Sequence, residues 1–466
     1  MTHVTATCTI CTTSDPSFQP NFISLINNTL SLMEKAFEIS LLSYGPMLQK
    51  HGIAYHEVNN MLLHGTPGST DGWVLYLSVR TLDTVVLLEN LLPLLKENNT
   101  PFSLVKNQLL QYQLNAGAFG EELVGKVITL FPKTTQDAVI LAGQINALSS
   151  NYSGPVVPGA ARIGKILYAP NPEKLPFHIA AEYRHKGKLP AILGRYYVPV
   201  QMIRSSAKGD IYKGVNIKGC AFNWCLIKQG KPSALDDHFG RDMKDRLLWQ
   251  REVLEDIAGN VPTPRFLDFF ERRDHSYLVM EYAEGEPLGL KVAEVLKGRT
   301  WLALNTEEKK QLLRWYLGAL EITGKVHQKG YVHRDISDMN FIILNDNRLC
   351  VIDFELSYSL TRQKPAVPFV LGTRGYMAPE QVQYAVPSVK EDVYSLGALL
   401  CFILTGKQPA DFIEAQPQQT MSKLQDLAEP GTLSNIVLKC LDPQREKRPE
   451  VKELREQVLD YYCLLN

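Results

Sequence analysis

The sequence has no excess of charge of either sign, because 49 lysine and arginine residues balance 49 aspartate and glutamate residues over 466 positions. This balance gives no reason to expect a nucleic-acid or membrane partner. Long hydrophobic runs are also missing. The longest, Val393 to Leu404, spans about 12 residues, which is too short to cross a bilayer and predicts a buried helix. The hydrophobic content of 45% is that of a globular chain, and the length predicts about three domains or subdomains.

Cysteine is scarce, with 8 residues scattered along the chain. The opening stretch MTHVTATCTIC has neither the basic region nor the apolar core of a secretory signal. We therefore expect free thiols and a cytoplasmic protein. Cys8 and Cys11 have the spacing of a metal-binding pair, but no second pair follows at zinc-finger spacing. An untethered tail is the favoured interpretation of this segment, with a metal site as the alternative.

The pattern of hydrophobic residues divides the chain into three parts. Residues 1–190 alternate strand-like and helix-like pieces, residues 195–285 are rich in short strands, and residues 286–466 are mainly helical. We therefore expect an α+β fold in which a strand-rich and a helix-rich lobe enclose a cleft. The expected elements are strands at 73–79 and 126–131, helices at 81–97, 137–148 and 241–258, and a polar linker at 183–188.

The stretch GYVHRDISDMNFIILNDNRLCVIDFE, residues 330–355, predicts a hairpin. Its two apolar runs, 341–344 and 349–352, are strand-like, and the turn-forming cluster Asn-Asp-Asn-Arg separates them. Because a hairpin returns the chain to its starting edge, Asn340 and Asp353 should lie close together, with Asp335 nearby. Oxygen ligands of this kind, completed by phosphates and water, suit Mg²⁺.

Residues 208–230 predict two strands joined by a turn, and Lys228 lies at the end of the second strand. From there its ammonium group could reach a phosphate. A buried lysine needs a carboxylate partner, and Glu252 in the charged helix is the candidate. Either residue alone is more often an ordinary strand-end lysine or a solvated glutamate. The prediction depends on the ordered set of residues.

From about residue 200 to 466, the chain resembles the protein kinase superfamily. His333-Arg334-Asp335 through Asn340 resembles the catalytic loop, and Ile352-Asp353-Phe354-Glu355 stands where the magnesium-binding motif is found. The resemblance implies a bilobal kinase fold with a β-rich N-lobe at 195–285 and an α-rich C-lobe at 286–466. The remaining similar motifs are the hinge at 277–285, Ala378-Pro379-Glu380, the helix start at Asp392 to Gly397, and Arg448 as the buried partner of Glu380.

The resemblance implies a role for each matching residue. Asp335 would accept or orient the substrate hydroxyl proton, and Asn340 and Asp353 would hold Mg²⁺. Lys228, held by Glu252, would grip the α- and β-phosphates of ATP. Thr373 matches a threonine that serine/threonine kinases place against the catalytic aspartate. The residues expected to contact the nucleotide are Gly209, Ile211, Lys228, Met280, Glu281 and Ala283.

Three positions depart from the family pattern. Only Gly209 remains of the usual glycine series in the phosphate loop at 205–212, Ser337 replaces a lysine, and Glu355 replaces the glycine after Asp353-Phe354. Ser337 and Glu355 also occur in small-molecule phosphotransferases and in the kinases of lanthipeptide synthetases.

Activation is a further expectation from the resemblance. Arg334 is the residue that meets a phosphorylated activation segment in similar kinases. The candidate phosphorylation sites in this chain are Ser357, Ser359 and Thr361.

A second resemblance covers about residues 55–285. Gly72-Trp73, Thr100-Pro101-Phe102 and 125–132 are similar to the lyase-type domain that precedes the kinase in class III lanthipeptide synthetases. Its catalytic lysines and histidine are replaced here by Val74, Tyr76 and Ser103. Elimination needs a base and cations for the departing phosphate. We therefore expect a lyase-like domain at 1–190 that has lost catalysis and binds peptide or regulates the kinase. Its remaining polar residues, His64, Lys126, Arg162 and Lys165, are expected to be structural or solvated.

The leading hypothesis is an ATP- and Mg²⁺-dependent kinase that phosphorylates serine or threonine of a protein or peptide, with a ribosomal precursor peptide as one candidate. A small-molecule phosphotransferase shares the His-x-Asp and Ile-Asp-Phe-Glu patterns but lacks a segment like Ala378-Pro379-Glu380. A non-catalytic scaffold is suggested by the degenerate glycine loop and disfavoured by Lys228, Asp335 and Asp353. The oligomeric state stays open.

Overall fold

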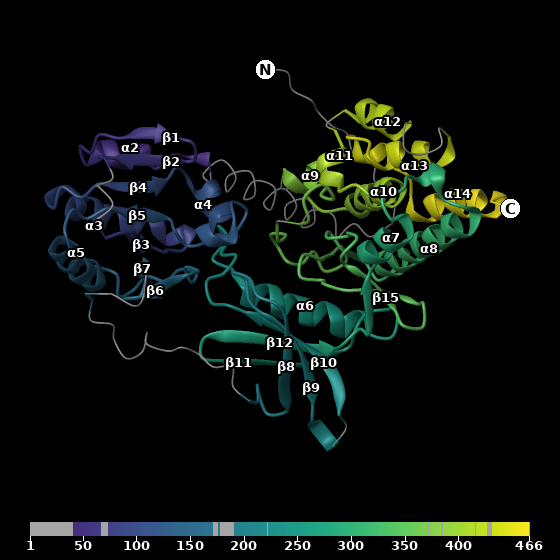
Figure 1. Ribbon diagram of the computed structural model, residues 1–466, viewed down its shortest axis with the longest axis horizontal. Coiled ribbons are helices and arrows are strands. Elements are labelled where there is room, and N and C mark those ends of the chain that lie inside the picture. The colour runs from purple at the N-terminus through teal and green to yellow at the C-terminus, as the bar shows by residue number, and fades with distance from the viewer. Residues whose placement is uncertain are drawn as a thin grey trace, which may run out of the picture.

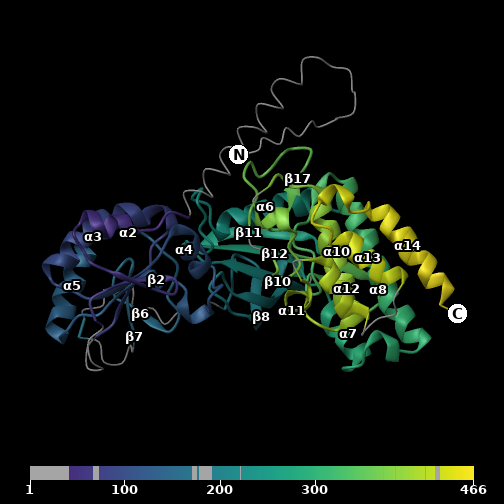
Figure 2. The same cartoon turned by 90° about the horizontal axis from the view of Figure 1, so that it is seen from above.

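The computed structural model describes residues 41–66, 73–170, 176–177, 191–220, 222–370, 372–383, 385–414, 416–425 and 431–465. Cys8, Cys11 and the expected linker at 183–188 lie outside these ranges. The N-terminal strands and helices, a middle sheet and the C-terminal helices form three groups (Figure 1). The view from above places the N-terminal group and the C-terminal helices at opposite ends (Figure 2). No helix within the described ranges is long and apolar enough to cross a membrane.

The N-terminal part is an antiparallel sheet in the strand order β1-β2-β4-β5-β3-β7-β6. Its alternate residues, such as Leu77, Leu104 and Ile128, are buried in one core with leucines of α3 and α5. The strands and helices expected between 73 and 148 are all present. The bounds are α2 Gly45–Lys50, β1 His56–Val58, β2 Met61–His64, β3 Leu75–Leu77, η1 Thr81–Asp83, α3 Thr84–Glu97, β4 Phe102–Val105, α4 Gln108–Asn115, η2 Glu121–Leu123, β5 Ile128–Leu130, α5 Thr135–Leu148, β6 Ala160–Arg162 and β7 Leu167–Pro170.

The middle part is a five-stranded antiparallel sheet in the order β11-β12-β10-β9-β8. Strand β10 lies at its centre, and helix α6 packs on it through a core that includes Leu247, Val253 and Leu278. Helix α6 begins after a capping box between Asp242 and Asp245. The bounds are β8 Tyr197–Arg204, β9 Ile211–Asn216, η5 Lys218–Cys220, β10 Asn223–Gly230, α6 Met243–Ile257, β11 Phe266–Arg272 and β12 His275–Glu281.

The C-terminal part is mainly helical and contains the predicted buried helix, α10, in which every residue from Leu396 to Thr405 is buried. Two small sheets, β13-β15-β16 and β14-β17, complete it. The bounds are β13 Gly285–Pro287, α7 Leu288–Leu296, η6 Trp301–Ala303, α8 Thr306–Gln328, β14 Tyr331–Val332, β15 Phe341–Leu344, β16 Leu349–Val351, β17 Tyr358–Ser359, α9 Pro379–Val382, α10 Val389–Thr405, α11 Pro409–Phe412, α12 Pro417–Gln425, α13 Thr432–Cys440, η7 Arg445–Lys447 and α14 Val451–Leu464.

A buried carboxylate links the N-terminal part to the segment between β10 and α6. Asp236 is 2% exposed, accepts the backbone N–H of Thr81 at 2.5 Å and accepts the side-chain amide of Asn115 at 3.3 Å. Burial outweighs these hydrogen bonds and raises the pKa of Asp236 to about 6. The junction therefore holds a carboxyl group that takes up a proton at higher pH than an exposed aspartate does.

Two further hydrogen bonds cross the same junction. The carboxylate of Glu121 accepts the backbone N–H of Ala207 at 2.6 Å, in the loop between β8 and β9. The hydroxyl of Tyr112, on α4, accepts a hydrogen bond from Arg246 of α6 at 3.3 Å. The N-terminal part thus contacts both the β8–β9 loop and α6.

The raised pKa of Asp236 predicts a pH-dependent junction. The folded chain binds the proton of Asp236 more tightly than the unfolded chain does. The contribution of this proton to the free energy of unfolding is therefore fully present below about pH 4 and is lost as the pH rises through about 6. We expect Asp236→Asn to remove on the order of 2–3 kcal/mol of that pH dependence. The measurement is the melting temperature from pH 4 to 7, with exposed Asp460→Asn as control. Equal pH profiles for wild type and Asp236→Asn would contradict this.

Candidate active site

The β15–β16 hairpin brings the ends of its two strands together. Phe341 pairs with Val351, and the N–H of Ile352 donates to the carbonyl of Asn340 at 2.9 Å. Asn340 and Asp353 therefore lie at the same edge, as the hairpin pattern predicts.

The carboxylate of Asp335 is held from two sides. Its Oδ2 accepts the side-chain amide of Asn340 at 2.9 Å, and its Oδ1 accepts the backbone N–H and the hydroxyl of Thr373 at 2.9 and 2.8 Å. The Asn340 amide also donates to the carbonyl of Asp335 at 2.7 Å. These three predicted residues thus come together. Oδ1 thus already accepts two hydrogen bonds and Oδ2 accepts one, so the remaining acceptor site of this carboxylate is on Oδ2.

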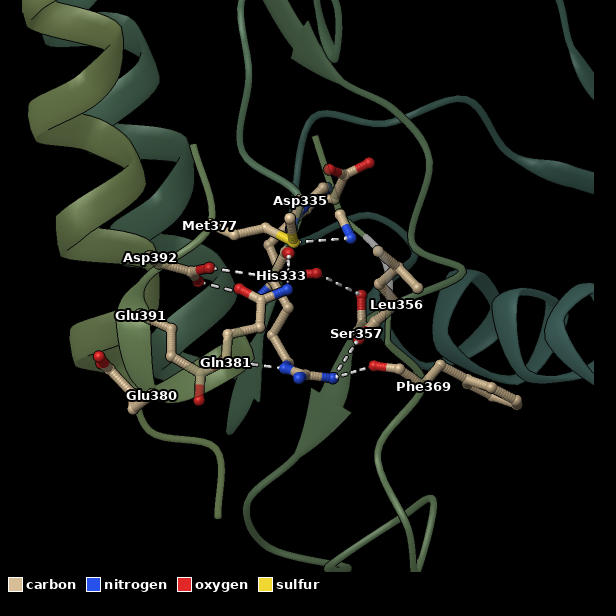
Figure 3. Close-up of polar contacts among 12 residues, drawn as sticks. His333, Asp335, Leu356, Ser357, Phe369, Met377, Glu380, Gln381, Glu391 and Asp392 are labelled. Atoms are coloured by element: carbon tan, nitrogen blue, oxygen red, sulfur yellow. Dashed lines mark hydrogen bonds and ion pairs between the residues drawn. The ribbon is translucent and has the colours of Figure 1, made fainter. Parts of the chain in front are cut away.

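The loop that carries Asp335 is anchored on buried Asp392, near the start of α10. The two carboxylate oxygens of Asp392 accept the backbone N–H groups of Arg334 and His333, both at 2.8 Å (Figure 3). The Nε2 of His327 also lies 2.8 Å from Asp392 Oδ2. Burial opposes ionisation, but these hydrogen bonds outweigh it and lower the pKa of Asp392. The sequence indicated only a helix start here, so this anchoring role was missed.

The ring of His333 connects the same loop to Asp353. Its Nδ1 accepts the N–H of Asp335 at 3.2 Å, so the proton lies on Nε2, which donates to the carbonyl of Ile352 at 3.1 Å. The ring also lies 4.7 Å from the buried ring of Phe354, between centroids. One tautomer of His333 therefore fixes the loop against the strand end before Asp353.

Lys228 is 9% exposed and binds two carboxylates from the C-terminal part. Its Nζ lies 2.7 Å from Asp353 Oδ1, 2.6 Å from Glu355 Oε2 and 3.2 Å from Gln250 Oε1. The predicted pairing of Lys228 with Glu252 is wrong, because Glu252 is exposed.

Helix geometry explains this correction. At 3.6 residues per turn, Gln250 shares the buried face of α6 with Arg246, Val253 and Ile257, and Glu252 falls on the opposite face. The same periodicity could have identified Gln250 in the sequence.

The charges around Lys228 do not balance. Burial opposes the charged ammonium, but Asp353 and Glu355 outweigh it and raise the pKa of Lys228. Burial also raises the pKa of Asp353, and the carboxylates of Glu355 and Asp335 add to this effect. Burial acts in the same direction on Glu355, but Lys228 outweighs it and lowers the pKa of Glu355 to about 2. Among the groups in direct contact, two carboxylates face the single ammonium of Lys228, which leaves an excess of negative charge there.

Mg²⁺ fits this excess of negative charge. The amide nitrogen of Asn340 is engaged with Asp335, so the amide oxygen of Asn340 and the carboxylate of Asp353 would hold the ion. Within the described part of the chain, no cluster of three or more His, Cys, Asp or Glu residues could hold a metal ion.

Most of the other residues expected to contact the nucleotide lie on or beside the middle sheet. Gly209 has a φ of 155°, and a Cβ there would lie 1.8 Å from the carbonyl of Gln229, so only glycine fits. Ile211 pairs with Lys228 across β9 and β10. Met280 is 3% exposed on β12. Glu281 ends that strand with its side chain paired to Arg265, and Ala283 follows it. Contact of these residues with a nucleotide stays a prediction.

Arg334 is not available for a phosphate group. It is 1% exposed, its Nε binds Glu391 at 2.8 Å, and its Nη1 donates to the carbonyl of Phe369 at 2.6 Å (Figure 3). Ser357 and Ser359 are fully buried. This arrangement contradicts the expectation that phosphate on either serine meets Arg334, because Glu391 already supplies the negative charge.

The predicted pair of Glu380 and Arg448 is confirmed. Arg448 Nη1 and Nη2 donate to the two carboxylate oxygens of Glu380 at 2.5 and 2.9 Å, and both residues are buried. This two-bond geometry holds the end of the segment after Asp353 against η7.

In the N-terminal sheet, Tyr76 and Ser103 both pair with Thr129 and so lie on one face, opposite the buried leucines. Val74, which precedes β3, is half-buried. Lys126 lies 4.5 Å from the centre of the Tyr76 ring.

The other polar residues of this part have structural contacts. His64 bonds to the carbonyl of Ala54 at 2.6 Å, and Arg162 donates to the carbonyls of Gly164 and Lys165 at 3.1 and 2.6 Å. The side chain of Lys165 is exposed. These placements agree with the structural or solvated roles expected for the three residues.

Comparison with known families finds two separate matches in the chain. Residues 253–460 match the protein kinase domain, and residues 56–168 match the RamC N-terminal domain. Serine/threonine-protein kinase D of Synechocystis sp. is 27% identical over 58% of this chain and 52% of its own length. Kinases B and C of the same organism are 31% and 33% identical over 40% and 47% of this chain, and 33% and 40% of their own lengths. The chain thus spans about half or less of these relatives.

The buried pair of Arg334 and Glu391 yields a stability prediction. Glu391→Ala leaves a guanidinium buried without its counter-charge, which typically costs about 3–5 kcal/mol. The exposed pair of Arg251 and Glu255 provides the control, and Glu255→Ala should cost less than about 1 kcal/mol. Urea unfolding would measure both, and similar losses in the two variants would refute the assigned role of Glu391.

Proposed function

Because residues 253–460 form a protein kinase domain of the serine/threonine type, we propose that the chain transfers the γ-phosphate of ATP to a serine or threonine hydroxyl of a protein or peptide. The observation that carries this proposal is the convergence of Lys228 on β10, Asp335 and Asn340 in the loop before β15, and Asp353 after β16. Phosphoryl transfer requires mainly positioning and neutralised charge, and these residues supply both.

Each residue acts in the position that the contacts give it. Asn340 and Asp353 would hold Mg²⁺, which would supply charge neutralisation for the phosphates when ATP is bound. Lys228 presents its ammonium beside Asp353 and binds phosphate oxygens. Asp335 accepts the hydrogen bond of the incoming hydroxyl, and Thr373 and Asn340 hold its carboxylate still.

As the more specific substrate, we propose a ribosomally made precursor peptide. The match of residues 56–168 to the RamC N-terminal domain supports this proposal, together with the resemblance to lanthipeptide synthetases. We assign no elimination chemistry to the N-terminal domain, placed at 1–190, because Val74, Tyr76 and Ser103 stand where that chemistry needs a histidine and lysines.

The N-terminal domain has a positioning role in this proposal. It reaches the phosphate loop through Glu121 and Ala207, and it reaches α6 through Tyr112 and Arg246. Arg246 also donates to the carbonyl of Val370, in the segment before Thr373, at 3.0 Å. The domain thereby contacts the phosphate loop directly and is linked to the segment before Thr373 through Arg246.

The transfer reaction tests the proposal directly. With Mg²⁺, radiolabelled ATP and dephosphorylated casein, we expect labelled phosphoserine or phosphothreonine from wild type, and at least about a hundredfold less from Asp335→Asn. The matched control is Asp346→Asn, in the exposed turn of the same hairpin, which should retain activity. Equal labelling by wild type and Asp335→Asn would refute the mechanism, as would labelling of small alcohols but of no protein.

The positioning role of the N-terminal domain predicts a split in the kinetic constants. Glu121→Ala removes the acceptor that holds Ala207 N–H, so the KM for ATP should rise several-fold with a smaller change in kcat. The neighbouring exposed Glu122→Ala serves as the control. An unchanged KM for ATP in Glu121→Ala would argue against this role.

A further inference from the structure

Helix α6 supplies Lys228 with an amide and no carboxylate. Gln250 Oε1 lies 3.2 Å from Lys228 Nζ, and Glu252 is exposed on the other face. An amide oxygen can accept a hydrogen bond from an ammonium group, but it cannot neutralise its charge. Since Lys228 is buried, the neutralising charges must come from another element.

Those charges come from one short stretch that follows β16. Asp353 and Glu355 flank Phe354, and their carboxylates reach Lys228 at 2.7 and 2.6 Å. Glu355 is the more deeply placed of the two, with a side chain 9% exposed against 31% for Asp353. The two carboxylates therefore differ in access: Asp353 faces the site where a cation would bind, and Glu355 lies behind it.

The backbone around Glu355 is held on both sides. Phe354 is fully buried, with its ring 4.7 Å from that of His333, and the indole N–H of Trp249 donates to the carbonyl of Ser357 at 2.7 Å. Trp249 belongs to α6, next to Gln250. This support gives Glu355 a fixed position relative to both Lys228 and the helix.

We propose that Glu355 is the positioning residue for Lys228, in place of a carboxylate on α6. This inference rests on the proposed kinase function. With Asp353 as a ligand of Mg²⁺, Glu355 would remain the counter-ion of Lys228 and would orient its ammonium group toward the phosphate oxygens. The position of Lys228 then depends on residues 353–355, and α6 contributes only a hydrogen bond.

A charge relocation tests this role. The variants are Glu355→Gln, Gln250→Glu and their double mutant, with exposed Glu252→Gln as the control. Each is measured for the KM for ATP and kcat on casein, for displacement of a fluorescent ATP analogue by MgATP, for its Mg²⁺ requirement, and for melting temperature.

We expect Glu355→Gln to raise the KM for ATP about tenfold and to lower kcat, whereas Glu252→Gln matches wild type. The double mutant should recover to within about threefold of wild type, because Gln250 already lies within hydrogen-bond distance of Lys228. A structural role alone would lower the melting temperature without this rescue.

Three results would overturn the inference. Wild-type kinetics in Glu355→Gln, while Asp335→Asn is inactive, would remove the role of Glu355 and leave the kinase function intact. A raised Mg²⁺ requirement that Gln250→Glu does not rescue would make Glu355 a metal ligand instead. Failure of the wild-type chain to bind MgATP or to label any protein would refute the proposed function itself, and with it this inference.

Discussion

The ammonium group of Lys228 joins two parts of the chain that are distant in sequence, since it lies on β10 and its partners Asp353 and Glu355 follow β16. A charged group at this depth is tolerated only when opposite charges surround it. The middle sheet and the helical part share one hydrophobic core, and this cluster joins them at the candidate active site. Because two carboxylates face one ammonium group, the cluster is suited to a divalent cation that also binds phosphate. An isolated pair of one lysine and one carboxylate would have no such excess of negative charge.

The groups around Lys228 are held by two supports of different kinds. On one side, buried Asp392 and the pair of Arg334 and Glu391 make the loop of Asp335 part of the helical core. On the other side, the N-terminal part contacts the β8–β9 loop and α6 through hydrogen bonds across the junction. A reaction that requires mainly positioning can use a domain of this kind without any chemistry of its own, which agrees with the proposal that assigns this domain no elimination chemistry.

Predictions from the sequence were right where the pattern is local. The β15–β16 hairpin, the capped helices α5 and α6 and the buried helix α10 all follow from periodicity and turn or cap residues within short stretches. The pair of Glu380 and Arg448 was identified through the family resemblance and is present. The errors concern partners: Glu252 for Lys228, and a phosphate for Arg334. In each case the partner that the sequence suggested carries a suitable charge, but the folded chain places another group against the cation: Gln250 and Glu355 against Lys228, and Glu391 against Arg334.

The sequence by itself determined the order of the elements, the edge at which Asn340 meets Asp353, and the kinds of side chain available for phosphate chemistry. Only the tertiary structure decided that Gln250 and Glu355 face Lys228, that Glu391 neutralises Arg334, and that Asp236 is buried against the N-terminal sheet. The physical reason is that a charged side chain takes its partner from whatever folding brings within about 3 Å, and that distance bears no relation to separation along the chain.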